Sequence, residues 1–128
     1  EWVQDGAIGE IKEVYGWSGA NGWSKGTQPP KETPAIPEGM NWELWLGPAR
    51  YRPYHPAYTP YNWRGWWDFG TGVLGDIGCH QLSAVFKALK PGHPISVEAC
   101  SSNYQVGPEI ANETAPKSSI TRWKMIPS

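Results

Sequence analysis

Asp76 and His80 are the residues whose types and spacing best suit the transfer of a proton. They are four residues apart, so on a helix they lie on one face, one turn from each other. An aspartate that holds one imidazole nitrogen leaves the other nitrogen free to accept a proton from a hydroxyl group. The pair therefore predicts a general base, in which His80 moves the proton and Asp76 orients the ring.

A helix over residues 76–89 is expected to carry this pair. Four apolar residues with helical spacing predict a stripe that packs against the core: Leu82, Val85, Phe86 and Leu89. Asp76 and His80 fall nearly opposite this stripe, together with Ser83 and Lys87. The positive end of the helix favours the Asp76 carboxylate and a neutral His80 ring. Glycines at positions 70, 72, 75 and 78 leave room for another molecule to approach the helix start.

Two other interpretations of the pair stay open. An aspartate at a helix start is usually a cap, and a histidine on a polar face is usually only solvated. Asp76 and His80 also have the spacing of two metal ligands, but two ligands are too few for a site and no third lies nearby in the sequence. Spacing alone leaves these interpretations beside the catalytic one.

Residues 50–69 are rich in aromatic residues and proline and show almost no periodicity. The whole chain has nine Trp and six Tyr but only two Phe. Indole rings suit the apolar face of a sugar, and arginine suits hydroxyl or carboxylate oxygens. The candidates for substrate binding are Trp63, Arg64, Trp66 and Trp67, followed by the weaker His55 and Tyr58. Packing in the core is the alternative for these rings, and it is evenly balanced with substrate binding for Trp66 and Trp67.

Other parts of the chain predict the elements around this site. Strands are expected at residues 8–18, 94–103 and 118–126, and polar loops at residues 19–39 and 104–117. A short helix is expected over residues 40–47, because Asn41 can cap its start and Gly47, followed by proline, ends it.

The size and charge of the chain exclude several classes of protein. The 128 residues fit one domain, and a formal net charge of −1 offers no basic patch for nucleic acid. No apolar run reaches the ~20 residues that a membrane-spanning helix needs. Cys79 and Cys100 match neither a disulfide framework nor a zinc pattern, and both are expected to be buried. Two such thiols favour a reducing compartment, so the expected location is cytoplasmic.

Several motifs resemble the C-terminal domain of the Gfo/Idh/MocA oxidoreductases. Residues 70–80, Gly-Thr-Gly-Val-Leu-Gly-Asp-Ile-Gly-Cys-His, resemble its Gly-rich, Asp-x-Gly-x-His signature. Residues 6–11 resemble the start of that domain's first strand, and residues 42–48 and 62–70 resemble a subgroup common in environmental bacteria. The resemblance covers most of residues 6–103 and is specific when the motifs are taken together.

The resemblance implies an α+β fold, with a mainly antiparallel open sheet and helices packed on one face. It also implies an enzyme that acts on a sugar, a polyol or a related hydroxyl compound. Members bind NAD or NADP in an N-terminal Rossmann domain, and the open sheet face often builds homo-oligomers. Asp76 and His80 match the family's catalytic positions, so His80 would move the hydroxyl proton while hydride passes between substrate and nicotinamide.

Three departures accompany the resemblance. The chain has no Gly-x-Gly-x-x-Gly fingerprint and no Glu-Lys-Pro motif, and Ser83 stands where many members have Asp. The first two follow if residues 1–128 are a truncated substrate-binding domain without its Rossmann half. Such a chain is expected to be inactive alone, to bind no cofactor itself and to oligomerise through its sheet. A non-catalytic carbohydrate-binding module and an NAD-dependent glycoside hydrolase domain remain the alternatives.

Overall fold

A computed structural model describes residues 1–19, 22–23, 25, 27–102, 105–106, 109–110 and 113–126 of the chain. The helical segments come first: α1 (Trp42–Leu46), the 3-10 helix η1 (Asn62–Gly65) and α2 (Gly72–Leu89). The strands follow: β1 (Pro94–Ser101), β2 (Gln105–Val106), β3 (Glu109–Ile110) and β4 (Ser119–Met125). The chain is therefore a small α+β domain, as its motifs predict.

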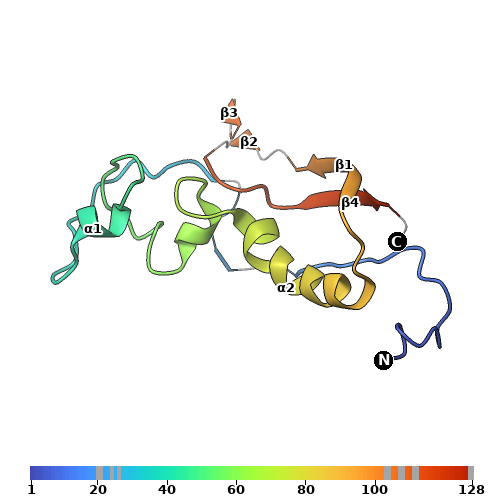
Figure 1. Cartoon of the computed structure of the whole chain (residues 1–128). Helices are drawn as coiled ribbons and strands as arrows, with labels where there is room; N and C mark the ends of the chain where they lie inside the picture. The colour runs from blue at the N-terminus through green and yellow to red at the C-terminus, as the bar shows by residue number, and fades with distance from the viewer. Residues whose placement is uncertain are drawn as a thin grey trace.

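The elements are spread along an elongated arrangement (Figure 1). α1 lies at one end and the N-terminal turn at the other, with α2 running between them. β1 and β4 pair antiparallel, with Val97 opposite Trp123 and Glu98 opposite Arg122. β2 and β3 form a separate antiparallel pair within the range 104–117, so the expectation of a loop is wrong for these residues.

α1 forms as its sequence predicts. The Asn41 side-chain oxygen accepts a hydrogen bond from the Leu44 N–H at 3.0 Å and so caps the helix start. Gly47 ends the helix with a φ of 56°, which a residue with a Cβ adopts reluctantly. These ends place Trp42 and Leu46 on the buried face and leave Leu44 in solvent. The helix expected over residues 40–47 is confirmed.

The core is a cluster of aromatic side chains that joins α1 to the segment leading into α2. Its buried members are Trp42, Leu46, Tyr58 and Trp66, against which Met40, Trp45, Tyr54, Ala57 and Phe69 pack. Tyr58 meets Trp66 edge to face, with 4.8 Å between the ring centroids, a geometry that suits the ring quadrupoles. The Trp42 indole donates to the Arg52 carbonyl at 2.8 Å, and the Trp66 indole to the Ala57 carbonyl at 3.0 Å. Packing of the core therefore uses both the apolar rings and the polar N–H groups of these tryptophans.

The expected strands are confirmed in part. β1 and β4 lie where the sequence predicts strands, within residues 94–103 and 118–126. Residues 8–18 are not a strand: most are exposed, and they pair with no other described segment. The alternation of apolar and polar residues there is imperfect, and a strand is stable only where a neighbour completes its hydrogen bonds.

Every residue of β1 is exposed, so among the described residues no helix covers either side of this strand. Two expectations about burial are wrong. Phe86, in the expected core stripe of α2, is 44% exposed, and the other members of the stripe are only half-buried. Cys79 and Cys100 are exposed free thiols. The stripe, and the sheet face that carries Val97, are apolar surfaces that the described chain leaves in contact with water.

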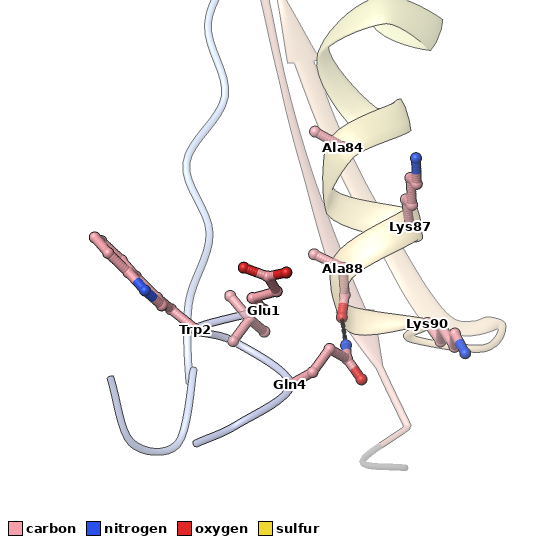
Figure 2. Close-up of a pocket in the computed structure, with 8 residues that line it drawn as sticks. Glu1, Trp2, Gln4, Ala84, Lys87, Ala88 and Lys90 are labelled. Carbon is pink, nitrogen blue, oxygen red and sulfur yellow. Dashed lines mark hydrogen bonds between the residues drawn. The ribbon is translucent and has the colours of Figure 1, made fainter. Parts of the chain in front are cut away.

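The N-terminal turn lies against the last turns of α2 (Figure 2). Its backbone closes where the Asp5 N–H donates to the Glu1 carbonyl at 2.8 Å. The Gln4 side-chain amide donates to the carbonyl of Ala88, near the end of α2. The last carbonyls of a helix have no partner within the helix, so this contact satisfies one of them.

Candidate functional site

α2 begins at Gly72, with Thr71 as its N-cap residue, and not at residue 76 as its sequence predicts. Asp76 therefore lies in the second turn, and the first turn contains no acidic residue. The charge effects of a helix end fall off within the first turn, so the expected stabilisation of the Asp76 carboxylate by the helix is wrong. His80 lies one turn further along α2, so the expected effect of the helix end on its ring is wrong as well.

Two glycines allow the chain to turn sharply into α2. A Cβ on Gly70 would lie 2.5 Å from the carbonyl oxygen of Arg64. Gly72 has a φ of +63°, and a Cβ there would lie 2.5 Å from the Cβ of Ala115. The sequence predicts that another molecule comes close to these glycines. In the structure, Arg64 and Ala115 of the same chain lie close to Gly70 and Gly72.

Residues 113–115, here called the strap, run beside the turn that leads into α2. The Trp67 N–H donates to the Glu113 carbonyl at 2.9 Å, and the Ala115 N–H donates to the Gly65 carbonyl at 2.7 Å. These two bonds act like a short piece of antiparallel ladder. They fix the entrance of the helix to a part of the chain that lies far away in sequence.

Thr114 connects the strap to the long N-terminal loop. Its buried hydroxyl accepts a hydrogen bond from the Thr27 N–H at 3.0 Å and donates one to the Thr27 carbonyl at 3.2 Å. A hydroxyl can do both because it has one donor and two acceptor positions. These two bonds hold the backbone at Thr27 against the strap.

Arg52 joins the strap to the aromatic core. Its NH1 lies 3.3 Å from Glu113 Oε2, and its NH2 pairs with Asp68 Oδ2. The guanidinium also lies over the rings of Tyr58 and Phe69, at 5.2 and 5.3 Å from their centroids. Burial lowers the pKa of Arg52, but the Tyr58 hydroxyl and the two carboxylates raise it by more. The net shift is upward, so the group stays charged.

Asp76 pairs with Arg64 and not with His80. Arg64 Nε lies 3.7 Å from Asp76 Oδ1, and both side chains are partly buried. The side chain of His80 is exposed and makes no hydrogen bond or ion pair within the described residues. Ser83 and Lys87, on the same side of α2, are exposed as well. This geometry leaves the His80 ring accessible to a ligand and gives Asp76 a cationic partner.

The guanidinium of Arg64 is surrounded by aromatic rings. Its Cζ lies 4.5 Å from the ring centroid of Tyr61, 4.6 Å from that of Trp63 and 6.0 Å from that of the buried Trp23. Tyr61 and Trp23 are site residues that the sequence candidates omit. Tyr61 lies three residues before Arg64, a spacing that a helical turn brings together, so it could have been found. Trp23 comes from the loop at residues 19–39 and has no local signal.

The other sequence candidates fall into different environments. Trp66 is 1% exposed and Tyr58 is also buried, so neither ring has a free face for a ligand, and the packing alternative holds for both. Trp67 is 50% exposed on the turn before α2. His55 is half-buried, and its Nδ1 accepts a hydrogen bond from the Ala57 N–H at 3.0 Å. The structure thus brings together Trp63, Arg64 and Asp76 from the predicted set.

The described residues contain neither a group of metal ligands nor a membrane-spanning helix. No group of three or more His, Cys, Asp or Glu side chains in this part of the chain could hold a metal ion. No helix within the described ranges has the length and apolar character needed to cross a membrane.

Comparison with protein families shows the family to which the chain belongs. Residues 7–111 match the family described as the oxidoreductase family, C-terminal alpha/beta domain, of the Gfo/Idh/MocA group. The match spans well over half of the chain, so the chain belongs to the Gfo/Idh/MocA oxidoreductase family and corresponds to a C-terminal domain. No curated protein matches the chain. The matched range includes Arg64, Asp76 and His80.

The nicotinamide cofactor that this family implies does not fit the described residues. A dinucleotide site is built from a parallel strand, a Gly-rich turn and a helix N-terminus that faces the pyrophosphate. The described strands pair antiparallel, and Ala115 fills the space at Gly72, the first residue of α2. No cofactor contact is therefore assigned to these residues.

Substitution of Gly72 by alanine is expected to destabilise the domain more than the same change at Gly39. Their φ values of +63° and +80° are both left-handed and cost alanine about 1–2 kcal/mol. Only Gly72 has a neighbour within 4 Å of the added Cβ, and the clash with Ala115 adds about 1–3 kcal/mol. The free energy of unfolding in urea, followed by tryptophan fluorescence, measures both variants. Equal losses would contradict the close contact between the strap and the helix start.

Proposed function

We propose that this chain is the substrate-binding domain of an NAD(P)-dependent oxidoreductase that acts on a sugar, a polyol or a related hydroxyl compound. The proposal is carried by the pair Asp76 and His80, which lies on α2 and within the matched family range. His80 exposes its ring and has no protein partner among the described residues, as a base that meets a substrate requires. NAD or NADP would be bound by a Rossmann domain outside these residues.

His80 takes the proton from a substrate hydroxyl group in this proposal, or returns it in the reverse direction. An imidazole can both accept and donate a proton near neutral pH. The Asp76 carboxylate, one turn away, stabilises the imidazolium that forms. Trp67 lies on the approach to α2, where its half-exposed indole can meet the apolar face of a sugar.

Two substitutions test these roles in a protein that joins the chain to its Rossmann domain. His80→Ala and Asp76→Asn are each expected to lower kcat by at least ~100-fold, because the first removes the base and the second removes the charge that stabilises its protonated form. Cofactor binding should be unchanged, since neither residue is placed at the nucleotide. His93→Ala, at an exposed histidine outside α2, is the matched control and should keep its activity. Normal rates in both site variants would refute the assigned roles.

Product analysis separates this function from the two alternatives. A net change in the redox state of the cofactor supports the oxidoreductase. Release of a free sugar with no net change would instead indicate an NAD-dependent glycoside hydrolase. Binding of a glycan to the chain alone that persists in His80→Ala would indicate a non-catalytic carbohydrate-binding module.

Self-association through the open sheet is part of the proposal. Side chains alternate along paired strands, so Val97 and Trp123 share one face of β1 and β4, and Glu98 and Arg122 share the other. Val97 is 57% exposed, although its face is the apolar one. A contiguous apolar patch on such a face would suit contact with a second copy of the chain.

Val97→Asp is expected to convert a dimer or larger oligomer into a monomer, because a carboxylate in an apolar interface has no partner. Ile120→Asp is the matched control: Ile120 is also exposed and apolar, but alternation places it on the opposite face. Sedimentation velocity at high protein concentration measures both. A monomeric wild type, or an equal effect of the two changes, would count against this face.

A further inference from the structure

Arg64 lies where η1 leads towards α2, and its guanidinium already has partners within the chain. The ring centroids of Tyr61 and Trp63 lie 4.5 and 4.6 Å from its Cζ, so aromatic rings restrain the planar group. Its NH1 donates to the Tyr61 carbonyl at 3.3 Å. Its Nε lies 3.7 Å from Asp76 Oδ1. Both Nε and NH1 are thus directed at the protein.

We propose that Arg64 is a positioning residue that fixes the carboxylate of Asp76, and that it does not bind the substrate. This inference rests on the proposed function, in which Asp76 assists His80. The start of α2 at Gly72 is too far from Asp76 for the helix N-terminus to hold its carboxylate. Arg64 is the cationic group that lies beside the carboxylate instead.

The restrained arginine selects one direction for the Asp76 side chain. Asp76 and His80 are one turn apart on α2, so the carboxylate could turn towards either His80 or Arg64. In the structure it pairs with Arg64, and the His80 ring has no hydrogen-bond partner among the described residues. Arg64 thereby fixes the direction of the Asp76 carboxylate, while both nitrogens of the His80 ring stay without a partner among the described residues.

Arg122 and Glu98 provide a comparison within the same chain. Their closest N–O distance is 4.0 Å, and their side chains are 84% and 76% exposed, against 26% and 32% for Arg64 and Asp76. Two mobile side chains lose conformational entropy when they pair, which cancels most of the gain at an exposed site. Arg64 is restrained by its rings before it meets Asp76, so this pair is the better fixed of the two.

NMR of the chain tests the contact without any cofactor or substrate. The side-chain Nε–H signal of Arg64 can be assigned by its loss in Arg64→Gln. Asp76→Asn removes the carboxylate charge and is expected to shift this signal. Glu98→Gln, which alters the exposed pair, is the matched control and should leave the signal in place. An identical Arg64 signal in the wild type and in Asp76→Asn would overturn the proposal.

Steady-state kinetics of the chain joined to its Rossmann domain distinguish positioning from substrate binding. Arg64→Gln is expected to lower kcat about 10- to 100-fold, because a misplaced catalytic group slows the chemical step. KM should stay within about two-fold, since no substrate contact is lost. Arg64→Lys keeps the charge but not the planar group between the rings, so the kcat of this variant should also be lower than that of the wild type. A raised KM with unchanged kcat in either variant would contradict the positioning role and indicate that Arg64 binds the substrate.

The two experiments also separate this inference from the function on which it rests. If the wild-type enzyme converts no hydroxyl compound, the proposed function fails, and the NMR shift alone decides whether Arg64 holds Asp76. If the wild type is active and Arg122→Gln loses as much kcat as Arg64→Gln, the effect is a general loss of charge and the positioning role falls.

Discussion

The guanidinium of Arg52 holds together the parts of the chain that position the site. It pairs with Asp68, shortly before α2, and with Glu113 in the strap, while it lies over two rings of the aromatic core. A cation so little exposed is stable only because carboxylates and rings replace its lost hydration. One side chain thus ties the core, the turn into α2 and the strap into one unit. The position of the helix start, and with it that of Asp76, depends on this unit.

Tryptophans serve two purposes around that unit, and the sequence distinguishes them poorly. Trp66 packs in the core, whereas Trp63 and Trp23 lie against the guanidinium of Arg64. A ring face that covers an arginine is not available to a sugar, so exposed Trp67 becomes the more accessible candidate for substrate contact. Composition predicts that rings matter, but only tertiary contacts decide whether a given ring packs, stacks on a cation or faces solvent.

Local signals predict the elements of the fold, and contacts between distant segments decide the rest. The ends of α1 follow from Asn41 and Gly47, because a cap and a stop act within one turn. The start of α2 lies at Gly72, where Ala115 leaves no room for a Cβ, and no local pattern reveals this contact. The strand expected at residues 8–18 fails for the same reason, since a strand requires a partner. In the site, the motif predicts Asp76 and His80, but the pairing of Asp76 with Arg64 appears only in three dimensions.

In the proposed function, this chain binds the substrate and another domain binds the nucleotide. Titration of this chain with NAD and NADH, followed by tryptophan fluorescence and confirmed by calorimetry, tests that division most directly. No saturable binding is expected, because the described strands are antiparallel and Ala115 fills the space at Gly72, the first residue of α2. Tight, stoichiometric binding would contradict the division and would make the aromatic segment at residues 50–69 the candidate cofactor site.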